Sequence, residues 1–401
     1  MTTMQERAEA HGLPIHKLDL EGDERLGVDP FAVWDEMTDV GGLFYSPVNR
    51  GYLVAADYDT VKHVLQDPHT WSNLPSSIVY TKQEVILDVP PITMDPPVHT
   101  KYRKALAPLF GPKAVAHLEP RIGEICHELI DGILEKGTCD FAKDFAAKLP
   151  ALFFLEWLGI GTEDVDRMFH LAERATFDFP TQEERNDIER QIDTIVRGAM
   201  TDRRTNPNPG DLATAFVNME VDGEPIPEDL LVGMAKLAFI AGQETTSSQL
   251  GFIMWHLARN KDDRQFLIED TSRIPGAIEE LMRFYNTGGS AGRVAKQDTE
   301  LNGFPVKAGD RIFIARCGAD RQLAPEVQLS RTGVPHSAFG LGVHRCLGSH
   351  VARLEMRIGL EVWHERIAQY RIPDDFVEEY RYGSFMQQLF HLPLEIEPAA
   401  R

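Results

Sequence analysis

The sequence predicts one large soluble domain that contains long α-helices. Hydrophobic residues make up 43% of the 401 residues and charged residues 26%, as in globular proteins that bury a sizeable core. No Ser/Gly tract, long charge block or internal repeat divides the chain, so residues 1–401 are predicted to form a single domain. Several segments also carry the apolar spacing or the end signals of α-helices.

Charge and hydropathy limit the classes of partner. The formal net charge of −21 argues against nucleic acid as a partner. No apolar run reaches the roughly 18 residues of a membrane span, and the charged residues 5–9 are not followed by a signal-peptide segment. We therefore expect a cytoplasmic protein with no membrane partner. The scattered Cys126, Cys139 and Cys317 are expected to be free thiols in a reducing compartment.

A turn followed by a helix start is predicted over residues 94–103. His99 and Arg103 are four residues apart in this segment and therefore share one helical face. Such a pair can hold a carboxylate group. Proline-rich helix starts are common, so the spacing alone is weak evidence for a binding site.

A long helix is predicted from Glu228 to Asn260, with Pro227 suited to its first position. Its middle is unusual, because residues 241–246 insert a glycine, an acid and two threonines into an apolar run. Such residues cost helix stability, and a threonine hydroxyl can bond back to the carbonyl one turn earlier. We expect a ligand to be the reason. A solvated Glu244 beside ordinary threonines is the alternative.

A further helix is predicted to open near Ser272 and Pro275. Glu280 and Arg283 are three residues apart in it, so the carboxylate and the guanidinium lie on one face. By itself, this is a common surface ion pair that contributes little stability.

Residues 339–348 place one cysteine, Cys346, in a glycine-rich loop that runs into a helix. Apolar residues at Val351, Leu354 and Ile358 predict that helix, so Cys346 lies at or just before its N-terminus. The unpaired N–H groups and the macrodipole there favour the thiolate, which is the form that ligates iron. Glycines at positions 340, 342 and 348 let the backbone approach a flat ligand without Cβ clashes.

Two other interpretations of Cys346 were weighed against iron ligation. A lone cysteine is most often a small buried hydrophobe, and the nearby His344 and His350 make a zinc site conceivable. Neither explains the glycines. The chain also lacks any Cys-x-x-Cys, which a zinc finger needs and which, followed by histidine, would attach a c-type haem.

The loop at 339–348 resembles the haem-binding loop of the cytochrome P450 family. Residues 99–103 match the family's His-x-x-x-Arg segment, 244–245 its acid–alcohol pair and 280–283 its Glu-x-x-Arg motif. The resemblance runs from about Asp29 to Leu394 and is strongest to bacterial soluble members that oxidise terpenoids. It implies a mainly helical α+β fold, namely a single cytochrome P450 domain with small β-sheets.

The resemblance also implies haem b as the cofactor, with Cys346 as the iron ligand. Phe339, which could shield the sulfur, and Gly340 belong to the haem-binding loop. The family's propionate-binding positions correspond to His99, Arg103, Arg293 and His344. Cys346 would push electron density toward the iron and favour O–O cleavage.

Two further roles follow from the resemblance. Glu244 and Thr245 would be the catalytic residues that relay protons to dioxygen as it is reduced. Glu280 and Arg283 would form a structural pair buried behind the haem.

The expected substrate pocket departs from the family pattern. Where the family usually has proline, this chain has Thr287, followed by Gly288 and Gly289, which should leave a roomier or more adaptable pocket. The loop around Ile78 to Val89, Phe177, Phe179 and the segment from Gly288 to Ala291 are also expected to line it. For each apolar residue, ordinary core packing is an equal alternative. The pocket residues proposed from the sequence are Leu87, Val89, Leu237, Ala241, Gly288, Gly289, Phe385 and Met386.

The implied reaction is monooxygenation of a hydrophobic small molecule, terpenoid-like or aromatic, with O2. A peroxide-driven peroxygenase is one alternative, which retention of Glu244 and Thr245 disfavours; a non-catalytic haem sensor is another. The chain has neither a four-cysteine cluster framework nor a Gly-x-Gly-x-x-Gly after a strand, so its electrons must come from outside.

A ferredoxin-type partner is the expected electron donor. Two stretches, between Asp95 and Glu119 and between Glu326 and Glu355, contain no acidic residue. Their basic residues could present a docking face to an acidic ferredoxin, or some of the arginines could simply neutralise haem propionates. The basic residues are Lys101, Arg103, Lys104, Lys113, Arg331, Arg345 and Arg353.

Overall fold

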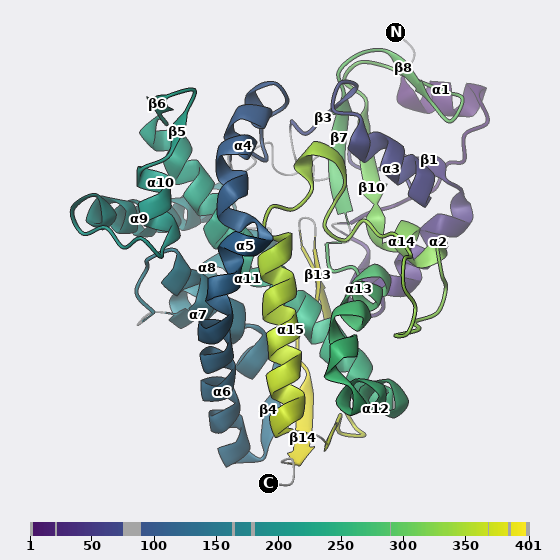
Figure 1. The fold of residues 1–401 in the computed structure, drawn as a ribbon. Helices are drawn as coiled ribbons and strands as arrows, with labels where there is room; N and C mark the ends of the chain where they lie inside the picture. The colour runs from purple at the N-terminus through teal and green to yellow at the C-terminus, as the bar shows by residue number, and fades with distance from the viewer. Residues whose placement is uncertain are drawn as a thin grey trace.

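Helices make up most of the fold, and the strands form small sheets, the largest at one side of the helical body (Figure 1). The structure is a computed structural model that describes residues 3–20, 22–74, 90–162, 165–177, 181–288, 290–367, 369–383 and 386–397. The predicted mainly helical α+β class is confirmed.

The α-helices are α1 (Met4–Ala10), α2 (Pro30–Val40), α3 (Tyr58–Gln66), α4 (Val98–Phe110), α5 (Pro112–Val115), α6 (Glu119–Lys136), α7 (Lys148–Trp157), α8 (Val165–Phe177), α9 (Gln182–Thr205), α10 (Leu212–Val217), α11 (Glu228–Arg259), α12 (Lys261–Glu269), α13 (Ile274–Phe284), α14 (Arg316–Gln322) and α15 (Ser349–Arg366). Shorter 3-10 turns are η1 (Glu24–Gly27), η2 (Ala116–Leu118), η4 (Thr271–Arg273) and η5 (Gly342–His344), and η3 (Ala142–Ala146) is a π-helical turn.

The strands are β1 (Leu43–Ser46), β2 (Tyr52–Ala55), β3 (Trp71–Ser72), β4 (Thr138–Asp140), β5 (Glu220–Val221), β6 (Glu224–Pro225), β7 (Ser290–Ala295), β8 (Thr299–Leu301), β9 (Phe304–Val306), β10 (Arg311–Ala315), β11 (Gln369–Arg371), β12 (Tyr380–Tyr382), β13 (Gln387–Leu389) and β14 (Pro393–Glu397). The five-stranded sheet has the order β1-β2-β10-β7-β3, and a three-stranded sheet has the order β11-β14-β4.

The central helix of the core is α11, which packs against α7, α8, α9 and α15. Most of its residues from Leu231 to Ala258 are buried, as expected for a helix that is apolar around most of its circumference. The predicted span is confirmed to within one residue. Pro227, however, occupies the N-cap position and not the first helical position.

Helix α15 follows the Cys346 loop and lies beside α6 and α13 (Figure 1). Val351 and Ile358 are buried on its inner face, as the apolar spacing predicts, and Trp363 is fully buried near its end. Because α15 begins at Ser349, Cys346 lies just before its N-terminus, as predicted.

The five-stranded sheet positions two arginines. In its register, Ile312 of β10 is opposite Arg293 of the antiparallel β7 and Leu53 of the parallel β2. Strand β10 then leads directly into α14, which begins at Arg316.

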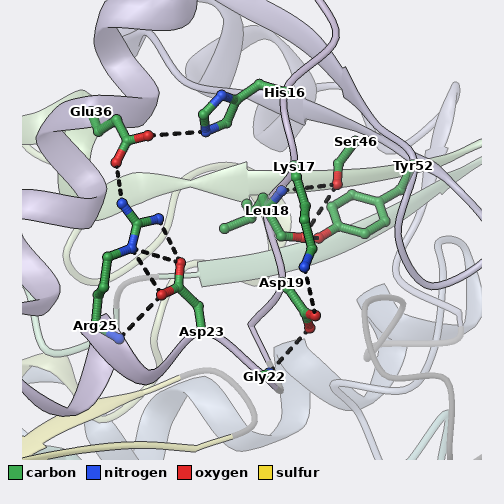
Figure 2. A network of polar contacts seen from close by, with 10 residues as sticks. All are labelled: His16, Lys17, Leu18, Asp19, Gly22, Asp23, Arg25, Glu36, Ser46 and Tyr52. Atoms are coloured by element: carbon green, nitrogen blue, oxygen red, sulfur yellow. Dashed lines mark hydrogen bonds and ion pairs between the residues drawn. The ribbon is translucent and has the colours of Figure 1, made fainter.

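Polar contacts tie the N-terminal segment to this sheet (Figure 2). The hydroxyl of Tyr52 donates to the carbonyl of Leu18 at 2.6 Å, and the amide of Leu18 donates to Ser46 Oγ at 3.2 Å. Nearby, Arg25 bonds to both Asp23 and Glu36, so the chain entering α2 is held by charge as well as by packing.

Candidate haem-binding and catalytic site

The loop that carries Cys346 is closed by its own backbone. The amide of Cys346 donates to the carbonyl of Phe339 at 2.7 Å, and the amide of Gly340 donates to Ser337 at 2.7 Å. Gly340 and Gly342 have φ angles of +67° and +69°, which favour glycine. A Cβ at Gly342 would also lie 2.3 Å from the carbonyl oxygen of Leu65, so protein packing and not a ligand requires this glycine.

Cys346 differs from the other three cysteines in its exposure. Cys126, Cys139 and Cys317 are buried free thiols, whereas Cys346 is a free thiol that is accessible. Protein nevertheless surrounds Cys346 at longer range, since burial raises the pKa of its thiol while the Gly348 amide and nearby arginines oppose the rise. An accessible sulfur in such surroundings suits a ligand held inside the protein.

Four predicted propionate-binding residues come together near this loop. The rings of His99 and His344 are 4.2 Å apart between centroids. The pKa of His344 is lowered to about 3, mainly by burial and to a smaller extent by the neighbouring His99 and Arg293. Burial also lowers the pKa of Arg293 to about 10 and that of Arg103 below its usual value. Arg103 and Arg293 therefore bring two positive charges, and His99 and His344 two ring systems with lowered pKa values, to a site with little solvent.

This cluster fits the two propionate groups of a haem. After burial, the arginines of the cluster lower the pKa values of its histidines, Arg293 and Arg103 that of His344 and Arg103 that of His99, so an anion placed among them would oppose these shifts. The Nδ1 atom of His99 is buried without a hydrogen-bond partner among the described residues. A carboxylate there would satisfy it.

Glu244 is an acid that is buried away from solvent. Its side chain is 1% exposed, and neither carboxylate oxygen has a hydrogen-bond partner within the described part of the chain. Burial raises the pKa of Glu244 well above its usual value, and Glu173 adds to the rise while Arg381 opposes it. Glu173 and Arg381 bond to each other at 2.5 Å.

The adjacent Thr245 bends its hydroxyl back along α11, as predicted. Its Oγ1 donates to the carbonyl of Ala241 at 2.8 Å. The prediction that a ligand explains Gly242 is wrong. A Cβ at Gly242 would lie 2.5 Å from ring atoms of Phe154, so close packing with α7 requires this glycine.

Glu280 and Arg283 form the predicted ion pair, and it is buried. Arg283 Nε and Nη2 donate to the two oxygens of Glu280 at 2.9 Å each, and both residues are at most 3% exposed. Arg331 joins them with an Nη1 donation to Glu280 Oε1 at 2.5 Å. Local spacing does not reveal this contact, because 51 positions separate Arg331 from Glu280.

The predicted pocket residues are described only in part. Leu87, Val89, Gly289 and Phe385, together with Ile78 and Phe179, lie outside the described residues. Ala241 is exposed within the otherwise buried α11, and Leu237 is half-buried. Met386 and Phe177, in contrast, are buried.

Hydrogen bonds replace the family's proline at Thr287. Its hydroxyl donates to the carbonyl of Gln387 at 2.6 Å, and its carbonyl accepts from the Gln387 amide at 2.9 Å. A Cβ at Gly288 would lie 3.0 Å from Nη2 of Arg316. On the side of Gly288 to which a Cβ would point, the Arg316 guanidinium therefore fills the space.

The acid-free stretches of sequence acquire acidic neighbours in the fold. Lys101 Nζ is 2.6 Å from Asp222, and Arg353 binds both oxygens of Glu279 at 2.5 and 2.7 Å. The Arg353 guanidinium also lies 4.3 Å from the ring centroid of Phe339. Lys104 and Lys113 are exposed, and no ion pair to either is seen among the described residues.

Within the described ranges, no group of three or more His, Cys, Asp or Glu side chains is arranged to hold a metal ion, so a zinc site at Cys346 lacks ligands there. No helix of the described chain combines the length and apolarity needed to cross a membrane.

Comparisons with known proteins give one consistent result. The family model described as Cytochrome P450 matches residues 165–363. Cytochrome P450 109 of Bacillus spizizenii is 32% identical over 88% of this chain and 87% of its own length. Steroid C26-monooxygenase of Mycobacterium tuberculosis is 31% identical over 87% of this chain and 96% of its own length. The crystal structure of cytochrome P450 CYP101C1 superposes with a TM-score of 0.86 at 26% identity, over 96% of this chain and 98% of that one. The chain therefore belongs to the cytochrome P450 family.

Proposed function

We propose that this cytochrome P450 monooxygenase binds haem b through the Cys346 thiolate and inserts one oxygen atom of O2 into a hydrophobic small molecule. The observation that carries the proposal is the accessible thiol of Cys346 beside the cluster of His99, Arg103, Arg293 and His344. Haem b presents both an iron that takes a thiolate ligand and two propionates, so one group would satisfy both features.

When bound, the haem supplies the iron at which dioxygen is activated and cleaved. The residues of this chain hold and orient it. Cys346 would provide the thiolate, and the Phe339 carbonyl holds the loop by accepting the Cys346 amide. Arg103 and Arg293 provide guanidinium forks, which suit carboxylates.

Glu244 and Thr245 would move protons. Since burial raises its pKa, Glu244 carries its proton at a pH where an exposed glutamate has lost it. The Thr245 hydroxyl, now donating to Ala241, can rotate to donate elsewhere while its oxygen accepts a proton. The Glu173–Arg381 pair is placed to influence the charge of Glu244.

For the substrate we favour a terpenoid-like or aromatic molecule. A relative that is 31% identical is named a steroid C26-monooxygenase, and steroids are terpenoid-derived. The exposed Ala241 and the half-buried Leu237 on α11 offer apolar contacts of the required kind.

For the electron donor we propose a ferredoxin with its reductase. The exposed Lys104 and Lys113 and the exposed Arg345, next to Cys346, would form the positive face that such an acidic protein needs. The four free thiols fit a reducing compartment, so we place the enzyme in the cytoplasm.

A reconstituted assay separates the candidate functions. A panel of hydrophobic compounds is first ranked by the spin shift of the haem Soret band. The purified holoprotein with the best compounds then receives either NADPH with a surrogate ferredoxin and reductase, or hydrogen peroxide alone. Product under the first condition, carrying oxygen from labelled O2, supports the monooxygenase. Product with peroxide only indicates a peroxygenase, and turnover under neither condition indicates a haem sensor.

A further inference from the structure

Arg316 belongs to none of the sequence motifs, yet it lies against the Cys346 loop. A Cβ at Gly288 would come within 3.0 Å of its Nη2 atom, and a Cβ at Gly340 would lie 4.0 Å from its Nη1 atom. Gly288 follows α13, and Gly340 is part of the loop that carries Cys346. The guanidinium therefore lies between these two segments, and the glycine at position 288 leaves room for it.

Two oppositely charged residues of helix α14, Arg316 and Asp320, form hydrogen bonds with the start of this loop. Arg316 Nη1 donates to the carbonyls of Ser337 and Ala338 at 3.2 and 3.4 Å. Asp320, one turn later, accepts from the amide of Ser337 at 2.8 Å and from its hydroxyl at 2.9 Å. Ser337 is fully buried, so its two bonds with Asp320 are shielded from water.

These hydrogen bonds act on Cys346 through the backbone. The next residue after Ala338 is Phe339, whose carbonyl accepts the Cys346 amide at 2.7 Å. A change in the position of residues 337–338 would therefore shift the hydrogen bond that holds the cysteine.

Arg316 also places a positive charge near the sulfur. Burial lowers the pKa of Arg316, while Asp320 and Cys346 act in the opposite direction, so Arg316 and Cys346 interact electrostatically. Guanidinium groups stay protonated in proteins. Reduction adds one negative charge to a thiolate-ligated haem, and a nearby cation stabilises the more negative state.

We propose that Arg316 is a positioning residue for Cys346. Arg316 holds the loop through Ser337 and Ala338, and its positive charge raises the reduction potential of the bound haem. This role rests on the haem-thiolate function proposed above.

The test compares Arg316→Gln, Arg316→Lys and a control, Arg321→Gln, in the holoprotein. Arg321 is on the same helix but is neutralised by Asp35 at 2.7 Å. The readouts are the ferric/ferrous potential from a spectroelectrochemical titration and amide hydrogen exchange in residues 337–346. Removing the charge in Arg316→Gln should shift the reduction equilibrium about tenfold toward the ferric state, which is about 59 mV for one electron.

The other variants separate the charge of Arg316 from its hydrogen bonds. Arg316→Lys should recover most of the potential, but residues 337–346 should exchange faster than in the wild type, because the shorter lysine side chain cannot place its ammonium where Arg316 Nη1 bonds to both carbonyls. Arg321→Gln should change neither readout. Wild-type potential and wild-type exchange in Arg316→Gln would overturn the inference.

Gly288→Ala provides a second route if Arg316→Gln does not fold. It keeps the charge but crowds Nη2, so exchange in residues 337–346 should accelerate; unchanged exchange would contradict the proposed role of Arg316 in holding the loop. The ferrous carbon monoxide spectrum of the wild type keeps the two proposals apart. A wild type without a thiolate-type band would refute the proposed function. A normal band, together with Arg316 variants whose reduction potential and amide exchange equal those of the wild type, would refute only the role of Arg316.

Discussion

Arg353 and Glu279 form a two-pronged ion pair that joins α15 to α13. The Nε and Nη2 atoms of Arg353 donate to the two Glu279 oxygens at 2.5 and 2.7 Å. Burial alone would raise the pKa of Glu279, but hydrogen bonds from Arg353 and His336 lower it to about 2. Arg353 is therefore already matched by an acid, which changes what its reversal should do.

Arg353→Glu should mainly destabilise the protein. It would place a second carboxylate beside Glu279 and remove the stacking on Phe339, at a cost of about 1–2 kcal/mol. The thermal unfolding midpoint of the holoprotein should fall. Arg357→Gln, on the same helix and bonded to Glu361 at 2.8 Å, is the matched control with a smaller effect. An unchanged midpoint for Arg353→Glu would show that the pair contributes nothing.

Lys104→Glu should slow electron transfer and leave stability unchanged. Lys104 is exposed, and within the described chain no acid pairs with it, so its charge is available to a partner. Stopped-flow reduction by a surrogate ferredoxin should be slower at low salt, and the difference should shrink as the Debye length falls from about 10 Å at 0.1 M to about 3 Å at 1 M. The substrate-induced spin shift should persist. Equal rates for variant and wild type at low salt would place the docking face elsewhere.

Thr245→Ala should uncouple the reaction. Without the hydroxyl that now donates to Ala241, reductant should still be consumed, but peroxide should be released at the expense of product. The ratio of peroxide to NADPH measures this. Ser248→Ala, which removes a buried hydroxyl further along α11, is the control and should stay coupled. Full coupling in Thr245→Ala would exclude the threonine from proton delivery.

Glu355→Gln should change how stability depends on pH. Glu355 is fully buried in α15; burial raises its pKa well above 4.5, and the Thr246 hydroxyl opposes the rise. Above pH 4.5 the unfolded chain releases this proton while the folded protein keeps it, so wild-type stability falls by about 1.4 kcal/mol per pH unit from this group.

The glutamine variant has no such proton. Its stability relative to wild type should therefore grow as the pH rises from 5 to 8, as followed by thermal unfolding. Thr246→Val should extend the wild-type dependence to higher pH, because it removes a hydroxyl that opposes the rise in the pKa of Glu355. A constant difference between Glu355→Gln and wild type at all pH values would refute the raised pKa.

Local sequence patterns predict the parts of the site whose residues are close along the chain. The start of α15 after Cys346, the span of α11, the Thr245 back-bond and the Glu280–Arg283 pair each depend on residues within one or two helical turns. These interactions are set by helix geometry, so spacing alone predicts them.

Contacts between distant segments could not be read in this way. Gly242 packs on Phe154, Gly342 on Leu65, and Gly288 on Arg316, and only the fold shows that these glycines face protein. Asp222 and Glu279 likewise meet basic residues that lie in acid-free stretches of sequence. Such pairings depend on tertiary packing, on which local spacing carries no information.

The most direct test of haem-thiolate ligation is the absorption spectrum of the ferrous carbon monoxide complex of the wild type and of Cys346→Ala. The wild type should show the strongly red-shifted Soret band of thiolate ligation, and Cys346→Ala should lose it. Cys317→Ala, which removes a buried thiol, is the control and should keep the band. A red-shifted band that survives in Cys346→Ala would contradict the assignment of Cys346 as the iron ligand.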